Sequence, residues 1–93
     1  MKQYEIKTNQ NHDVLEIWQG VNEFGEEGYF VIARNPYGKQ WPYEWGAYYK
    51  LDEGYWAYGH YGFTSLQQAR ADMLSCYKDF NLDLIIKNKL GEL

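Results

Sequence analysis

Residues 64–80 carry the feature that most constrains the fold, because they hold a long run of apolar side chains at helical spacing. These side chains recur every three or four residues and so form one stripe along a helix. A hydroxyl residue stands three positions before a glutamine at the start of the run, which is the pattern of a capping box. We predict a helix over 64–80. Its buried stripe comprises Leu66, Ala69, Met73, Tyr77 and Phe80, and its polar side comprises Gln67, Arg70, Asp72 and Lys78.

The chain before this helix consists of short runs that are typical of strands. Residues 29–34 are apolar on both faces until Arg34, which favours a central strand of a sheet. Residues 45–51 and 55–61 are joined by three residues that end in glycine, a connection typical of a hairpin. Shorter runs with strand character lie at 4–8 and 14–18.

Glycine and proline mark the connections between these runs. Residues 20–28 contain three glycines and predict a loop. Asn35-Pro36-Tyr37-Gly38 has the residue order of a type I turn. Pro42 places the stretch after this turn in a loop or at a strand edge, and Gly59 and Gly62 predict a bulge or a bend at a sheet corner.

The sequence therefore predicts one α+β domain over residues 1–93, with a four-stranded antiparallel meander packed by one C-terminal helix. Residues 82–90 again show helical spacing, with Asn81 as a cap and Gly91 as an end signal. We predict a short second helix there. A fifth strand at 82–88 is the alternative.

Charge and cysteine content narrow the classes of partner and of compartment. The net charge is −4 and the pI is near 5.0, which argues against unaided binding to duplex nucleic acid or to a membrane surface. Cys76 is the only cysteine, so no disulfide forms within one chain. The opening residues lack the apolar core of a signal peptide. We expect a cytoplasmic protein of a bacterium or of a phage-infected host cell.

The residues that could carry chemistry do not form a recognisable motif. The two histidines, His12 and His60, and Cys76 show no zinc-site spacing. A nucleophilic pair of Cys76 with His60 is possible in principle, but a thiol in the middle of a helix beside its apolar stripe is usually inert. The paired carboxylates at 26–27 and 52–53 lie in predicted turns, which are ordinarily solvated, so neither pair has the environment of an acid catalyst. We predict no catalytic residues, no metal and no cofactor.

The most informative segment, residues 41–63, is dense in Tyr and Trp and poor in charge. These side chains combine a large apolar area with a polar group and few rotors, and they are enriched at protein–protein hot spots. We expect about half of them to pack inside and the rest to be exposed. The predicted partner-binding residues are Trp41, Tyr43, Trp45, Tyr48, Trp56 and Tyr58, and the residues predicted to steer a basic partner are Glu23, Glu26 and Glu27.

These observations favour a non-enzymatic protein-binding module that acts as an inhibitor or adaptor on a protein partner, such as a basic nucleic-acid-binding protein. The small size, the acidity and the strands-plus-helix plan of the whole chain resemble in style the small proteins encoded by phages and mobile elements, including anti-CRISPR and anti-restriction inhibitors. No family motif is matched, so no functional residues carry over. Two alternatives stay open. One is a binder of single-stranded nucleic acid or of a small ligand that uses the exposed aromatics, with Arg34, Lys39 and Lys50 as phosphate contacts. The other is a structural homo-oligomer.

Overall fold

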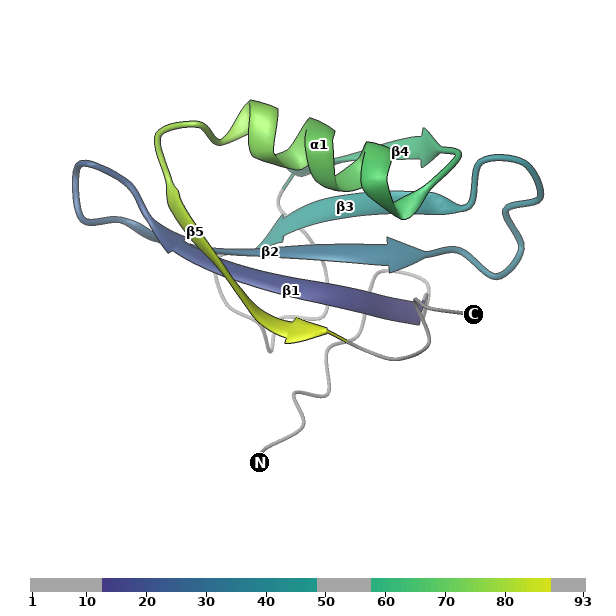
Figure 1. Ribbon diagram of the computed structural model, residues 1–93, viewed down its shortest axis with the longest axis horizontal. Helices are drawn as coiled ribbons and strands as arrows, with labels where there is room; N and C mark the ends of the chain where they lie inside the picture. The colour runs from purple at the N-terminus through teal and green to yellow at the C-terminus, as the bar shows by residue number, and fades with distance from the viewer. Residues whose placement is uncertain (1–12, 49–57, 88–93) are drawn as a thin grey trace.

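The computed structural model describes residues 13–48 and 58–87, which form one antiparallel sheet of five strands and one helix (Figure 1). The strands lie side by side in the order β4-β3-β2-β1-β5, and all neighbours are antiparallel. Their bounds are β1 Asp13–Val21, β2 Glu27–Arg34, β3 Tyr43–Tyr48, β4 Tyr58–Phe63 and β5 Asn81–Lys87, and the helix α1 is Leu66–Cys76. The predicted strand at 4–8 and the predicted turn at 52–54 lie outside the described residues.

The central place of β2 is confirmed. It pairs with β1 on one side and with β3 on the other, and four successive side chains in it are buried: Phe30, Val31, Ile32 and Ala33. Successive side chains of a strand point to opposite faces. Both faces of the sheet are therefore covered at β2, which is what its continuous apolar sequence predicted.

The two turns that flank β2 differ in how well the sequence predicted them. The β-turn predicted at 35–38 is present, since the backbone N–H of Gly38 donates to the carbonyl of Asn35 over 3.0 Å. The predicted loop over 20–28 is too long. In the structure β1 continues to Val21 and β2 begins at Glu27, with Gly20 paired to Gly28. Gly20 is required for packing, because a Cβ there would overlap the backbone of Asn81 in β5.

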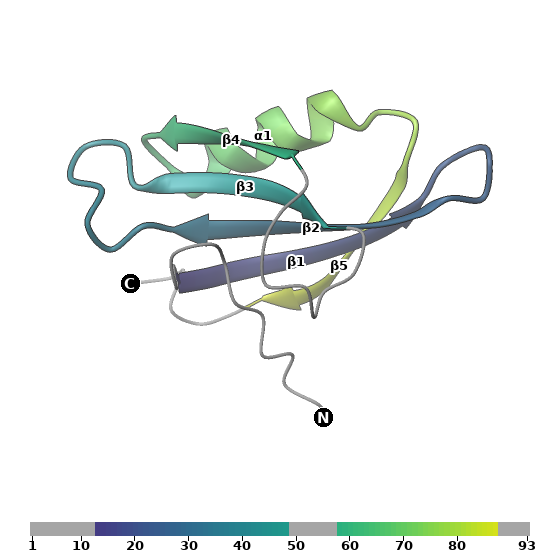
Figure 2. The ribbon, with the colours of Figure 1, turned by 180° about the vertical axis from the view of Figure 1, so that it is seen from behind.

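The helix lies across one face of the sheet, above β3 and β4, as both views show (Figures 1 and 2). Ser65 caps it by accepting a hydrogen bond from the backbone N–H of Gln68, three residues on. The helix is shorter than the predicted 64–80 and ends at Cys76. Tyr77 follows as a non-helical cap and its ring still packs on Phe30, with 4.4 Å between the ring centroids. The predicted apolar stripe is confirmed, because Ala69 and Met73 are fully buried.

Residues 81–87 correct the prediction of a second helix. They form β5, an edge strand that pairs with β1, so the sheet has five strands in the described residues rather than four. The segment satisfies both spacings, since Leu82 and Leu84 alternate while Leu82 and Ile85 are one helical turn apart. Without β5, β1 would present a row of unpaired backbone groups, and pairing with β5 satisfies them. Pairing with β1 therefore selects the strand over the helix. The paired residues Val21 and Asn81 are sixty positions apart in the sequence.

The prediction that Arg70 lies on the polar side of the helix also needs correction, because its side chain contacts the sheet. Its guanidinium forms a two-pronged ion pair with Glu16 of β1, whose side chain is about 1% exposed. The indole N–H of Trp18 donates to the same carboxylate over 3.0 Å. The hydrogen bonds that Arg70 donates to Glu16 raise the pKa of the guanidinium. Glu16 is therefore a buried structural group.

The core between the sheet and the helix is built around Trp45, Phe30, Ile32, Ala69 and Met73. Leu15, Ile17, Val31 and Ala33 are also buried. The helix in the described ranges is neither long nor apolar enough to cross a membrane.

The contact of β3 with β4 depends on glycine at position 59. Gly59 pairs with Gly46, and a Cβ on it would overlap the backbone oxygen of Trp45 and lie 3.2 Å from the Cα of Gly46. A backbone oxygen in a central strand cannot move aside as a flexible side chain can. We expect Gly59→Ala to cost about 1–3 kcal/mol of stability. Chemical denaturation measures this, and Gln40→Ala in the β2–β3 loop, where the side chain is exposed, is the comparison. An unchanged midpoint for Gly59→Ala would contradict the described pairing.

The bulge predicted from the other glycine is confirmed. The register of β4 against β3 shifts between the Tyr43–Phe63 pair and the Trp45–His60 pair, so β4 has one extra residue there. Gly62 lies in this interval with a φ of 83°, a conformation that glycine adopts without strain.

Candidate functional site

Trp45, one of the predicted partner-binding residues, is in the core. Its relative exposure is 0%, and its ring packs edge-on against Tyr77 of the helix end. It therefore cannot contact a partner in this structure. The alternation of β3 explains the error, because a strand that holds Trp45 inward leaves its neighbours on the other face, and the sequence did not show which face the helix covers.

The other predicted aromatic residues are placed differently. Tyr43 is half-buried and packs against the core. Tyr48 and Tyr58 are at the ends of β3 and β4, where the structure gives the position of the backbone. Trp56 lies outside the described residues. Among those of the six whose side chains the structure describes, only Trp41 is exposed, with a relative exposure of 59%.

Trp41 lies in the β2–β3 loop together with Tyr37, which is 86% exposed and was not among the predicted binding residues. Asn35 fixes this loop at both ends. The side-chain oxygen of Asn35 accepts a hydrogen bond from the backbone N–H of Tyr37 over 2.9 Å. The backbone N–H of Asn35 donates to the carbonyl of Pro42 over 2.7 Å. The loop therefore holds two large aromatic side chains in solvent on a hydrogen-bonded frame.

The predicted steering residues Glu23, Glu26 and Glu27 are exposed at the β1–β2 turn. Figure 1 shows this turn at the opposite end of β2 from the β2–β3 loop. Eight residues of strand separate the two turns, which is roughly 26 Å at about 3.3 Å per residue. The carboxylates and Trp41 thus belong to two separate surfaces.

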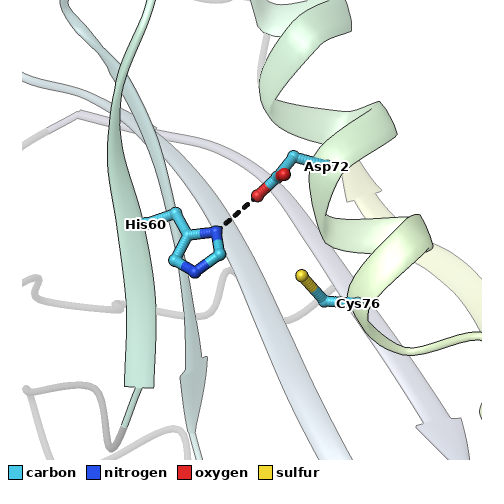
Figure 3. A group of neighbouring side chains, drawn as sticks. All are labelled: His60, Asp72 and Cys76. Carbon is cyan, nitrogen blue, oxygen red and sulfur yellow. Dashed lines mark hydrogen bonds and ion pairs between the residues drawn. The ribbon is translucent and has the colours of Figure 1, made fainter.

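The structure brings together three residues that sequence reasoning did not combine: His60, Asp72 and Cys76 (Figure 3). One donor atom of each lies within 4.8 Å of the donor atoms of the other two. His60 comes from β4, while Asp72 and Cys76 are one turn apart on the same side of α1. The i, i+4 spacing of the Asp and the Cys was a signal in the sequence, but the position of His60 against them comes from the packing of α1 on β4.

Asp72 is the hydrogen-bonding centre of this cluster. Its Oδ2 lies 2.6 Å from Nδ1 of His60 and 2.8 Å from the indole nitrogen of Trp45. Partial burial raises the pKa of the Asp72 carboxyl, but the two hydrogen bonds outweigh it, so the pKa lies below its ordinary value. Since an ionised carboxylate only accepts, Nδ1 of His60 carries the proton. The imidazole also packs on Trp45, with 5.0 Å between the ring centroids.

The cluster does not have the layout of a nucleophile–histidine–carboxylate relay. In a relay the imidazole lies between the other two groups, with the carboxylate at one ring nitrogen and the nucleophile at the other. Here a carboxylate oxygen of Asp72 and Sγ of Cys76 lie within 4.8 Å of each other. Partial desolvation and the nearby Asp72 charge also raise the pKa of the Cys76 thiol, whereas a cysteine nucleophile needs a lowered pKa.

This pKa shift predicts slow alkylation of Cys76. Below its raised pKa the thiol is protonated and unreactive, so the rate of reaction with iodoacetamide should rise at a higher pH than for a cysteine in the unfolded chain. Because Asp72 contributes to the shift, Asp72→Asn should move the midpoint of the rate profile to lower pH. The only cysteine is Cys76, so mass spectrometry follows one site. A folded-state midpoint at or below the unfolded one would contradict the environment described here.

No family model matches the chain, and neither a curated protein nor a solved structure matches it.

Proposed function

We propose that this protein is a non-enzymatic module that binds another protein, as an inhibitor or adaptor, through the β2–β3 loop. The observation that carries the proposal is the pair of exposed aromatic side chains, Tyr37 and Trp41, on a loop that Asn35 fixes by hydrogen bonds. The net charge of −4 favours a partner with a basic surface.

The hydrogen bonds within the loop support this proposal on energetic grounds. Association loses conformational freedom in every segment that must become ordered, and a frame that is already hydrogen-bonded avoids part of that cost. Tyr and Trp are the residue types that most often contribute the large binding energies at interfaces, because they bury a large rigid area. The β2–β3 loop, with Trp41 and Tyr37 both exposed, therefore has the composition of a binding hot spot.

The alternative of single-stranded nucleic-acid binding has less support. Stacking platforms for nucleic acid combine aromatic rings with cations that track the phosphates. One of the three proposed phosphate contacts, Arg34, forms an ion pair with Asp13 at 3.2 Å. Lys39 is exposed in the β2–β3 loop, and Lys50 lies outside the described residues.

The acidic β1–β2 turn contributes to binding of only some partners, because it is far from the β2–β3 loop. Charges in solvent are screened over about 8 Å at physiological ionic strength, and the turn is roughly three times that distance from the loop. Glu23, Glu26 and Glu27 therefore steer only a partner that is large enough to span β2. For a smaller partner, replacing all three with glutamine should leave the association rate unchanged.

Affinity capture with and without nuclease tests the proposal. The tagged full-length chain is used as bait in a bacterial lysate, and a tagged Tyr37→Ala/Trp41→Ala variant is used in parallel. A protein retained after nuclease by the wild type and lost by the variant is the expected result. Loss with nuclease would move the function to nucleic-acid binding. Self-association alone, measured by sedimentation, would make the surface a subunit contact.

A further inference from the structure

We propose that His60, Asp72 and Cys76 bind a divalent transition-metal ion of borderline softness, with Zn²⁺ as the best fit. The proposal does not depend on the protein-binding function. It rests on convergence, since an imidazole nitrogen, a carboxylate oxygen and a thiol sulfur lie within 4.8 Å of one another. Figure 3 shows the three side chains directed into the space between β4 and α1.

The donor set selects the class of metal. Imidazole and thiolate favour zinc and its neighbours over Mg²⁺ and Ca²⁺, which prefer oxygen ligands. Zinc is often held by three protein ligands with water in the fourth position. Donor atoms around a tetrahedral zinc with bonds of 2.0–2.3 Å are about 3.4 Å apart. The three groups are therefore already near their final places, and side-chain rotation of Cys76 at the exposed end of the cluster supplies much of the remaining adjustment.

The surrounding structure holds the carboxylate in place. The indole of Trp45, which is fully buried, donates to Asp72 over 2.8 Å. Partners of this kind orient metal ligands, and their loss commonly weakens binding about 10- to 100-fold. The ion would take the place of the proton that now lies between Nδ1 of His60 and Asp72, so that this nitrogen and the carboxylate both become ligands. The imidazole stays neutral, because exchange with solvent moves its proton from Nδ1 to Nε2. Cys76 would bind as the thiolate and release its proton.

The chain has few cysteine and histidine residues, so a metal-binding signal can be assigned to single side chains. Cys76 is the only cysteine, and there are two histidines, of which His12 lies outside the described residues. Reduced full-length protein is titrated with Co²⁺, and binding is followed by the thiolate-to-cobalt charge-transfer absorption, which then reports on Cys76 alone. Zn²⁺ is added in competition to obtain its affinity. The variants are Cys76→Ser, His60→Gln and Asp72→Asn, with His12→Gln and Asp79→Asn as matched controls.

We expect one Co²⁺ per chain. The absorption should be abolished by Cys76→Ser, the affinity should fall about 10- to 100-fold or more in His60→Gln and Asp72→Asn, and neither control should change it. Because Cys76 is exposed, Cys76→Ser should fold normally, and the circular dichroism spectrum of every variant is recorded without metal. Absence of the charge-transfer band would overturn the proposal. So would a band that His60→Gln and Asp72→Asn leave unchanged in folded protein, or one ion shared by two chains.

Discussion

Replacing Arg70 with alanine is expected to destabilise the fold by about 3–5 kcal/mol, although the residue lies on a helix surface. The reason is Glu16, whose buried carboxylate receives both prongs of the guanidinium. Removing one partner of a buried ion pair leaves the other charge in a medium that solvates it poorly. Urea denaturation of the variant and the wild type measures the difference in the free energy of unfolding.

Arg34 supplies the matched control for this experiment. It also pairs with a carboxylate, that of Asp13, but both side chains of this pair are partly exposed. Exposed pairs contribute about 0–1 kcal/mol, so Arg34→Ala should have a small effect. A double variant that replaces both Glu16 and Arg70 with methionine should recover much of the lost stability, because no buried charge remains. Equal effects of Arg70→Ala and Arg34→Ala would contradict the burial of Glu16.

Trp45→Ala is expected to cost about 3–5 kcal/mol of stability, while Trp41→Ala should change stability by less than about 0.5 kcal/mol. The two residues are four positions apart and have the same side chain, but Trp45 is fully buried and Trp41 is 59% exposed. Trp45→Ala opens a cavity at the centre of the core and also removes the indole N–H that donates to Asp72. Thermal or urea unfolding of both variants makes the comparison directly.

This pair of variants also tests where the binding surface lies. If Trp45 were on a surface, as the sequence analysis predicted, both substitutions would leave stability unchanged and both would weaken partner binding. The burial of Trp45 predicts that stability is lost there, and the proposed function predicts that binding is lost at Trp41.

The parts of the fold that local sequence determines were predicted well. The helix follows from the Ser65 cap and the spacing of Ala69 and Met73, and all of these signals lie within a few residues of one another. The central place of β2 follows from its unbroken apolar run. The turn at 35–38 follows from Asn, Pro and Gly at defined positions. Each of these signals acts through the chain's own neighbours, so no knowledge of the packing was needed.

The errors arose where distant residues decide the outcome. Residues 82–86 fit a helix or a strand, and pairing with β1 selects the strand. Arg70 was assigned to the polar side of the helix, and nothing in the sequence indicates that the packing of α1 on the sheet brings it to Glu16 across 54 residues.

The candidate site shows the same limit. Density of Tyr and Trp in 41–63 indicated an aromatic surface, but the choice of exposed ring depends on the face that the helix covers. Tyr37 stood just outside that segment and was missed. The His60 cluster was missed because Asp72 was assigned to the polar side of the helix, and nothing in the sequence indicates that β4 lies beside that side.

The most direct test of the proposed function is the affinity of the purified partner, once captured, for variants of the two exposed turns. Trp41→Ala is compared with Phe24→Ala, because Phe24 is also an exposed aromatic held in a turn by an asparagine, at the other end of β2. The proposal predicts that Trp41→Ala raises the dissociation constant about 30-fold, the effect of a hot-spot residue, and that Phe24→Ala leaves it unchanged. An unchanged dissociation constant for Trp41→Ala, or a larger loss for Phe24→Ala, would contradict the assignment of binding to the β2–β3 loop.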